Sequence, residues 1–385
     1  MSESLPDATP YETDVFVIGG GPAGLAAAIA ARERGFRVLV ADGLQPPIDK
    51  ACGEGLLPDG REALERLGIQ VPMADAYPFC GIRFVSAALS AEARFPADGC
   101  GLAVRRTTLH RIMIERAAQL GVGLLWRTAV TGISSQEVRL RDQEGDRDSD
   151  RVVRAHWIVG ADGTNSRVRR WAGLDGGSRP RLRYAFRRHY RVARWSDHME
   201  VYWGEHCQGY ATAVSSDQVC VALASHDSSL RLEDGLRALP RLSARLAGAE
   251  TVSAERGAIT GNRTLARVCR GNVALIGDAS GTVDAITGEG LGLAFRQAVA
   301  LSKCFESGDL RRYQIEHRRL ALRPLWMARL MLTLDRRPWL QHRTLQVFQQ
   351  RPEVFRRFLE LHVGALPPLH VVKDGLTLGW GLLTA

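Results

Sequence analysis

The chain has 385 residues, a length that allows about two domains. Its 45% hydrophobic and 24% charged residues are typical of an ordinary soluble globular protein, and the sequence contains no apolar run near the ~18–20 residues that a membrane span needs. The net charge of +9, carried almost wholly by arginine, can attract acidic ligands, nucleic acid or anionic lipid. Because the sequence has no nucleic-acid-binding motif, we expect no nucleic-acid partner.

The amino terminus and the cysteines predict a cytoplasmic protein. Residues 1–11 are polar and acidic, with neither the basic start nor the apolar centre of a secretory signal. The seven cysteines form no CxxC pair and no zinc spacing, which fits a reducing compartment and predicts no metal site.

Residues 14–42 are the most informative segment. They read as a strand, a glycine turn, a helix, a second strand and an acidic residue, Asp42. The turn matches GxGxxG, the pattern of a dinucleotide-binding crossover, and consists of Gly19, Gly20, Gly21, Pro22, Ala23 and Gly24. The free N–H groups that begin the helix favour phosphates, and Asp42 stands where a ribose hydroxyl is expected.

The rest of the chain divides into a mixed first part, a β-rich block and a helical end. Between residues 52 and 160 we expect helices at 58–67 and 105–120 and a hairpin at 81–96. We also expect strands at 122–130 and 137–142, a charged hairpin loop at 143–150 and a short buried strand at 157–160. Four strands then follow at 184–194, 198–203, 209–214 and 218–224, with a helical stretch at 229–248. A buried strand at 272–276 and a helix at 290–306 precede an arginine-rich helical end after residue 309.

Two later turns place an acid directly after a buried strand. Asp162 lies in the turn GADG, and Asp278 lies in GDAS. Ligands of open α/β sheets bind at the carboxyl ends of strands, so both acids are candidate ligand contacts. The segment from Thr287 to Gly290 then opens a helix whose N–H groups can face an anionic atom.

These three signatures, in this order, resemble the FAD-dependent monooxygenase superfamily with the p-hydroxybenzoate hydroxylase fold. The resemblance covers roughly residues 12–310 and is nearest to the branch of geranylgeranyl reductase-like proteins and bacterial flavoprotein hydroxylases. It implies an α/β fold, with a Rossmann-like FAD-binding domain of the glutathione reductase type, an inserted antiparallel β-sheet substrate domain and a C-terminal helical segment. The implied domains are FAD-binding at 12–75, 100–178 and 265–310, substrate at 76–99 and 179–264, and helical at 311–385.

The resemblance also assigns roles to residues. Arg106 matches an arginine that reaches the FAD phosphates, with Arg105 as the fallback; Asp162 touches FAD and, in hydroxylases, serves NAD(P)H; Asp278 binds the ribityl chain. The full cofactor-binding set is Gly19, Gly21, Pro22, Ala23, Gly24, Asp42, Cys52, Gly53, Arg106, Asp162, Gly277, Asp278, Gly288, Gly290 and Leu291.

Plainer interpretations of these residues stay open. Arg106 can be a surface charge, Asp162 can cap a turn, and Cys52, the candidate at the reactive edge of the flavin, can be a buried structural thiol. The candidate pocket residues are aromatic and can equally be packing residues of a sheet; they are Tyr184, Tyr202, Trp203 and Tyr210.

The reaction class depends on smaller motifs. The turn Cys52–Gly55, of sequence CGEG, resembles the CGG-type turn of geranylgeranyl reductases, but the aromatic YxWxFP strand motif of that group is replaced by GYATAV at 209–214. The WxWxIP motif of halogenases is also missing, and Lys50 precedes the glycine turn instead of lying by a substrate. Ser280 and Ala285 depart from simple aromatic hydroxylases.

The remaining expectation is an enzyme that uses FAD and NAD(P)H to hydroxylate a lipophilic aromatic or polyketide-type substrate of secondary metabolism. In that family O2 adds at flavin C4a, and the resulting C4a-peroxyflavin transfers one oxygen to the substrate, which requires a dry, apolar pocket. The alternatives are a geranylgeranyl reductase-like enzyme that saturates isoprenoid double bonds and a non-catalytic flavin-binding partner protein. The basic C-terminal helices suit peripheral contact with a membrane, or packing on the FAD domain, and the sequence leaves the oligomeric state and the catalytic acid or base open.

Overall fold

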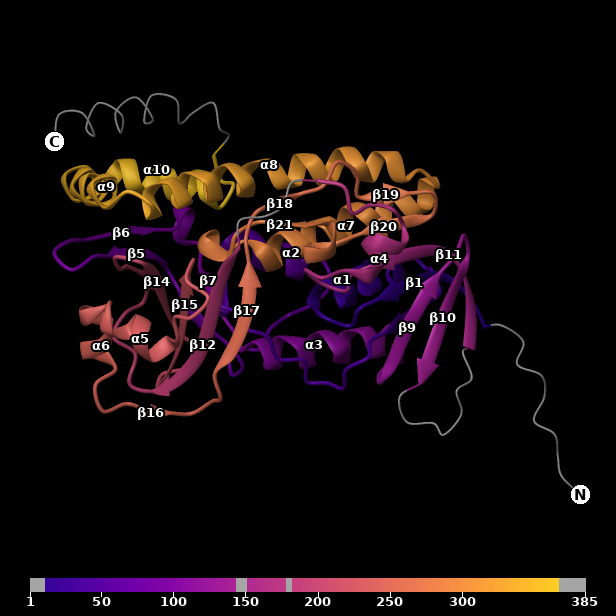
Figure 1. Cartoon of the computed structure of the whole chain (residues 1–385), viewed down its shortest axis with the longest axis horizontal. Helices are drawn as coiled ribbons and strands as arrows, with labels where there is room; N and C mark the ends of the chain where they lie inside the picture. The colour runs from indigo at the N-terminus through magenta and orange to yellow at the C-terminus, as the bar shows by residue number, and fades with distance from the viewer. Residues whose placement is uncertain (1–10, 143–150, 178–181, 367–385) are drawn as a thin grey trace, which may run out of the picture.

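Two sheets stand side by side in the computed structural model, with long helices crossing over both (Figure 1). The structure describes residues 11–142, 151–177 and 182–366. The predicted loop at 143–150 and the last part of the predicted helical region, 367–385, lie outside these residues.

The first sheet carries the predicted dinucleotide-binding crossover. Its parallel strands run in the order β8–β2–β1–β11–β20, and β1 is buried because α1 (Pro22–Arg32) and other helices cover the sheet. The strands are β1 (Tyr11–Ile18), β2 (Val38–Ala41), β8 (Gly123–Leu125), β9 (Thr128–Ile133), β10 (Glu137–Asp142), β11 (Arg151–Gly160), β19 (Cys269–Arg270) and β20 (Val273–Leu275). The helices of this half are α1, α2 (Pro58–Glu65), α3 (Arg106–Gln119), α4 (Arg167–Trp171) and α7 (Gly290–Ser307).

The register of this sheet aligns three turns that are distant in sequence. Ile18, the last residue of β1, pairs with Gly160 of β11, and Gly160 pairs with Leu275 of β20. Because these strands are parallel, the residues that follow them leave the same edge. The turns that begin at Gly19, Ala161 and Ile276 therefore meet there.

The second sheet has eight strands and forms a wall beside the first. Its order is β16–β12–β15–β14–β13–β5–β6, and β17 pairs with β12. Every pair is antiparallel except β13 with β5, which is parallel, so the expected antiparallel sheet contains one exception. The strands are β5 (Gly81–Val85), β6 (Ser90–Arg94), β12 (Arg183–Arg191), β13 (Met199–Trp203), β14 (Cys207–Ala213), β15 (Gln218–Ser225), β16 (Glu250–Thr251) and β17 (Arg256–Thr260).

The expected helix at 229–248 is interrupted. Pro240 begins a new helix, so the segment forms α5 (Leu232–Arg237) and α6 (Pro240–Arg245), which cover one face of the second sheet. A proline cannot donate the backbone hydrogen bond that would continue the first helix, which explains the break. The smaller elements are β3 (Gly55–Leu56), β4 (Tyr77–Phe79), β7 (Gly101–Ala103), β18 (Arg263–Thr264), β21 (Gly281–Thr282) and three short 3₁₀ turns at 96–98, 277–280 and 285–287.

Three helices close the other face of the second sheet. They are α8 (Leu310–Asp335), α9 (Pro338–Gln350) and α10 (Pro352–His362), and they lie along the top of the molecule in Figure 1. None of the helices in the described part of the chain is both long enough and apolar enough to span a bilayer.

Candidate functional site

One cavity of about 700 Å³ extends from the aligned turns of the first sheet to the face of the second sheet. Its volume lies within the ~300–1,000 Å³ typical of ligand pockets. Its first half is lined by backbone and charged groups, and its second half by apolar side chains. We call these the dinucleotide half and the substrate half.

The glycine turn after β1 forms the floor of the dinucleotide half. A Cβ at Gly24 would lie 1.8 Å from the carbonyl oxygen of Gly19, so α1 can approach the turn only with glycine there. At Gly21, by contrast, a Cβ would meet no atom within 4 Å, and this residue lines the cavity together with Pro22 and Ala23. The start of α1 has no side-chain cap in the described structure, so its N–H groups remain available to an anion.

Two side chains hold this turn from behind. Asp42 accepts hydrogen bonds from the N–H of Gly20 (2.7 Å) and of Leu44 (2.8 Å), and it also lines the cavity. His110, a fully buried residue of α3, accepts from the N–H of Ile48 through Nδ1 (3.2 Å) and contacts the Gly20 carbonyl through Nε2 (2.8 Å). Burial lowers the pKa of His110 and so favours the neutral ring, in which Nδ1 can accept from Ile48 while Nε2 donates to the Gly20 carbonyl. His110 was not predicted.

Asp162 lines the cavity, but its carboxylate is used locally. It accepts from the N–H of Arg167 (2.6 Å) and of Val168 (3.2 Å) and from the Ser166 hydroxyl. These bonds hold the start of α4. The structure therefore favours the alternative in which Asp162 caps a turn, and any contact with a ligand would come in addition to that role.

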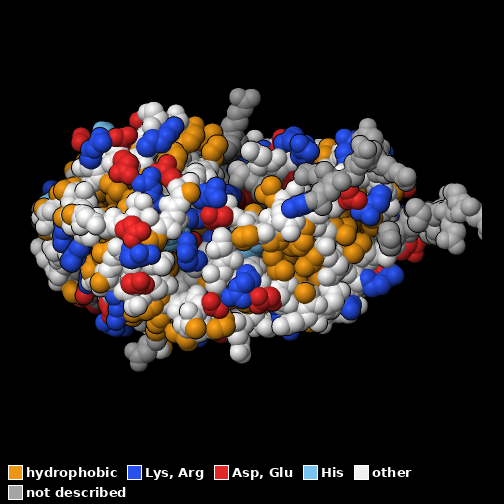
Figure 2. Space-filling model, turned by 90° about the horizontal axis from the view of Figure 1, so that it is seen from below, with side chains coloured by type: hydrophobic (Ala, Val, Ile, Leu, Met, Phe, Trp, Pro, Cys, Tyr) orange, Lys and Arg blue, Asp and Glu red, His pale blue; other side chains and the backbone are white. Residues whose placement is uncertain are grey.

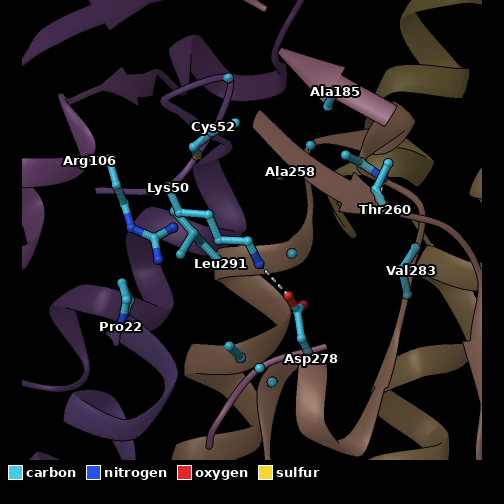
Figure 3. Close-up of a pocket in the computed structure, with 18 of the residues that line it drawn as sticks. Pro22, Lys50, Cys52, Arg106, Ala185, Ala258, Thr260, Asp278, Val283 and Leu291 are labelled. Atoms are coloured by element: carbon cyan, nitrogen blue, oxygen red, sulfur yellow. Dashed lines mark hydrogen bonds and ion pairs between the residues drawn. The ribbon is translucent and has the colours of Figure 1, made fainter. Parts of the chain in front are cut away.

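Asp278 projects into the centre of the cavity from the end of β20 (Figure 3). It accepts from the Lys50 ammonium (3.0 Å) and the Thr164 hydroxyl (3.2 Å). Burial would raise the pKa of Asp278, but Lys50 and Thr164 outweigh that effect and hold the pKa below its usual value. From the sequence, Lys50 was considered only as a halogenase lysine and was given no role in the site; the structure places its ammonium against Asp278 in the dinucleotide half.

Arg106 also projects into the cavity, toward the same region as Lys50 (Figure 3). Its Nε is buried and has no hydrogen-bond partner in the described structure, so the guanidinium has capacity for an anionic ligand. Cys52 and Gly53 line the cavity beside these two cations, and a Cβ at Gly53 would meet no atom within 4 Å.

A second glycine segment closes the dinucleotide half from the side of α7. Gly277, Gly288, Gly290 and Leu291 all line the cavity, and Gly288 has a left-handed φ of +69° that favours glycine. His362, the last residue of α10, contacts the carbonyl of the preceding Thr287 through Nε2 (3.1 Å). The C-terminal helices therefore position the segment at which α7 begins.

The substrate half is made of aliphatic and aromatic side chains from strands and helices. Its lining includes Ile82, Phe84, Met199, Val201 and Ala222 from the second sheet, and Met327, Met331, Phe348, Phe355, Phe358 and Leu359 from α8–α10. Phe348 and Phe355 stack with ring centres 4.5 Å apart, and Phe355 also approaches Phe84 at 5.4 Å.

Of the four aromatic residues predicted for this wall, only Tyr210 lines the cavity. Tyr202 points to the opposite face of β13 from Val201, and its hydroxyl donates to Glu200. Trp203 is buried in a stack on Phe84, 4.7 Å between centres, and Tyr184 precedes the lining residues of β12. The expectation for these three residues is corrected accordingly.

The residues of the dinucleotide half fit FAD. The uncapped start of α1 and the unpaired Arg106 Nε suit a pyrophosphate, and open Cβ positions at Gly21, Gly53, Gly288 and Gly290 leave room for close approach to backbone. A family model described as "FAD binding domain" matches residues 12–307. The chain belongs to this FAD-binding family. It is accordingly an FAD-dependent oxidoreductase.

Curated relatives of this FAD-binding protein include three reductases. The chain is 29% identical over 330 residues to menaquinone reductase of Mycolicibacterium smegmatis, covering 78% of each protein. It is 27% identical over 321 residues to digeranylgeranylglycerophospholipid reductase of Methanoculleus marisnigri, covering 77% of this chain and 78% of that one. With the menaquinone reductase of Mycobacterium tuberculosis, the match spans only 49% of the relative's length.

Solved structures share the whole fold of this FAD-binding protein. p-Nitrophenol 4-monooxygenase of Pseudomonas putida superposes with a TM-score of 0.77 and 18% identity, covering 92% of this chain and 99% of that one. At this identity the likeness establishes the fold alone.

Proposed function

We propose that the protein is an NAD(P)H-dependent FAD monooxygenase that hydroxylates a lipophilic aromatic or polyketide-type substrate. The observation that carries the proposal is the continuity of the cavity, which joins the dinucleotide half to an apolar substrate half without an intervening wall. A substrate bound among Phe84, Phe355 and Met199 would therefore lie next to the Cys52–Gly55 turn. FAD supplies the redox chemistry when bound, including the activation of O2.

The residues of the chain have three tasks in this proposal. Arg106 and the start of α1 bind the phosphates, while Asp278 and Lys50 orient the polar middle of the cofactor. The aromatic and methionine side chains of α8–α10 hold the apolar part of the substrate and exclude water, which oxygen transfer requires. The missing YxWxFP motif supports a substrate wall that differs from that of isoprenoid reductases.

A second candidate is saturation of an isoprenoid double bond, and the curated relatives favour it. Those of Mycolicibacterium smegmatis and Methanoculleus marisnigri are named as reductases, and each match covers about three quarters of the two chains. The long apolar half of the cavity would also accept a prenyl chain.

One product assay separates the two candidates. Purified protein with FAD, NAD(P)H and isotopically labelled O2 is offered an alkyl-substituted phenol and, separately, a prenylated quinone. Mass spectrometry showing one labelled oxygen in the phenol supports hydroxylation, whereas two added hydrogens in the prenyl chain with no label support reduction. Hydrogen peroxide as the only product from both would refute both assignments.

We also propose that α8 and α9 contact an anionic membrane surface. Exposed on these helices are Trp326 (49%) and Trp339 (58%), together with Ile315 and Leu322, and arginines accompany them. The substrate half lies under the same helices, so a lipophilic substrate could pass directly into it. The face opposite these helices instead shows positive and negative side chains interspersed (Figure 2).

Vesicle binding tests this contact. We expect the protein to sediment with vesicles containing phosphatidylglycerol, and less so as salt is raised, but not with pure phosphatidylcholine. The double variant Trp326→Ser, Trp339→Ser should lose most of the binding. Equal sedimentation of the variant and the unchanged protein would contradict the proposal.

A further inference from the structure

Glu54 occupies an unfavourable backbone position in the turn that faces the cavity. Its φ is +60°, in the left-handed region, although both sequence neighbours are glycines that would adopt such an angle freely. A side chain in this conformation is strained. The residue is also a carboxylic acid and only 3% exposed. Such an outlier points to a function for the carboxylate.

The carboxylate of Glu54 belongs to a continuous line of hydrogen bonds. Its Oε1 accepts from the N–H of Arg106 (3.0 Å), and its Oε2 lies 2.6 Å from Nε2 of His189 on β12. The other ring nitrogen, Nδ1, lies 2.9 Å from the Ser253 hydroxyl and 3.3 Å from the Arg187 guanidinium.

The position of the proton on His189 follows from Arg187. A guanidinium can only donate hydrogen bonds, so Nδ1 of His189 is the acceptor. The ring proton is therefore on Nε2 and is donated to Glu54. Ser253 can donate its hydroxyl proton to Nδ1, and every bond in the line then points inward, toward Glu54.

The two ends of the line reach different environments. Glu54 lines the cavity beside Cys52, whereas His189 is 1% exposed and lies behind it. Ser253 is partly exposed, between β16 and β17 at the surface of the second sheet. The line thus connects solvent with the cavity through one buried imidazole.

The surrounding charges are balanced. Arg187 also donates to Asp49, which in turn pairs with Arg256 (3.2 Å). Cys220 of β15 is the other titratable group in the cluster, and burial raises the pKa of its thiol well above the usual value, so it stays neutral. Arg187 also pairs with Glu54 itself, its Nε lying 3.9 Å from Oε1, so the carboxylate of the relay has a cationic partner.

We propose that Ser253, His189 and Glu54 form a proton relay that delivers one proton from solvent to the cavity in each turnover. Hydroxylation and double-bond reduction with NAD(P)H both consume one proton, so the proposal rests on the function above only through its use of NAD(P)H. In the transfer, the Ser253 hydroxyl gives its proton to Nδ1 of His189 and takes a replacement proton from solvent. The Nε2 proton moves to Glu54, which releases it into the cavity. Between turnovers the ring loses the Nδ1 proton and regains a proton on Nε2 by exchange with water, which restores the tautomer in which Nδ1 accepts from Arg187.

Two variants at Glu54 separate the relay from a role in folding. Glu54→Gly relieves the backbone strain but leaves the buried Nε2–H of His189 without its acceptor, so we expect these effects on urea stability to offset roughly while turnover falls by about 100-fold. Glu54→Gln keeps the size but cannot carry the proton, and it should lose turnover similarly. His189→Gln should behave in the same way, whereas His206→Gln, at an exposed histidine, is the matched control.

A readout without turnover keeps the test independent of the substrate. Nitrogen NMR of the apoprotein should show His189 protonated on Nε2, and Glu54→Gly should disturb that signal. Proton uptake during chemical reduction of bound FAD, followed with an indicator dye, should be about tenfold slower in Glu54→Gly and His189→Gln.

The outcomes are distinguishable. If the unchanged protein forms neither product, the proposed function fails while proton uptake still tests the relay. Unchanged proton uptake and an unchanged pH profile in both Glu54→Gly and His189→Gln, or a ring proton on Nδ1 of His189, would overturn the relay.

Discussion

The two halves of the cavity are built in different ways. The dinucleotide half is made mainly of backbone at three strand ends, with a few side chains such as Lys50 and Asp278 projecting into it. The substrate half is made of side chains from a second sheet and three helices. A backbone surface changes little when side chains are exchanged, whereas an apolar wall changes with each substitution. The first half therefore defines the cofactor, and the second can define the substrate.

The largest effect should come from filling the floor of the dinucleotide half. Gly21→Trp places a ring in space that is open around the Cβ position, so the fold should survive while the Kd for FAD rises by at least about 100-fold. FAD released on denaturation measures the occupancy. Gly132→Trp, at a similarly open glycine outside the cavity lining, is the control, and normal occupancy in Gly21→Trp would refute the assignment of the turn.

A smaller effect is expected in the middle of the cavity. Asp278→Asn removes the charge that pairs with Lys50 and should raise the Kd for FAD about tenfold, with little change in the urea midpoint. Fluorescence titration of the apoprotein with FAD provides the measurement. An unchanged Kd would show that Asp278 does not contribute to FAD binding.

The substrate half should respond differently. Phe355→Leu keeps an apolar side chain but loses the stack with Phe348, so we expect KM for the lipophilic substrate to rise about fivefold and the Kd for FAD to stay the same. Phe36→Leu, in an aromatic pair with Phe305 in the core around the first sheet and outside the cavity lining, is the control and should leave KM unchanged. A change in FAD affinity in Phe355→Leu would mean that the two halves are not separable.

The smallest effect appears only in acid. Burial lowers the pKa of His317 to about 4, and its Nε2 bonds the Ser280 hydroxyl (2.8 Å) behind the Asp278 turn. Because the unfolded chain binds this proton more readily, stability is full above pH ~6.5 and falls with slope ~1.4 kcal/mol per pH unit down to about pH 4. His317→Gln should flatten this part of the urea-stability profile, and an identical slope in both proteins would contradict the prediction.

The sequence predicted the dinucleotide half well because its signals are local. Gly21 and Asp42 lie in one βαβ unit, and the later acids follow apolar strands directly, so parallel pairing was enough to bring all of them to one edge. The α/β class was implied by the family resemblance, and the helical end followed from the residue pattern after position 309.

Other parts of the site depend on contacts that no local pattern carries. Lys50 reaches Asp278 across 228 positions, and Glu54 meets His189 across 135. In the second sheet, a shift of one residue exchanges the two faces, so Tyr202 and Val201 could not be assigned to the correct side without the register. The sequence predicted the helices that complete the substrate half. It could not show which of their faces line the cavity, because that depends on where the second sheet lies.

The order of strands also constrains how the protein is made. Because β1, β11 and β20 are neighbours, the flavin crevice needs chain from residue 11 to beyond residue 290 before it is complete. During synthesis the amino-terminal crossover is made first, and it lacks the two other turns of the crevice until most of the polypeptide has left the ribosome. We therefore expect it not to retain FAD before that point. Loading with FAD is then a late event of biogenesis, and truncated products should emerge colourless.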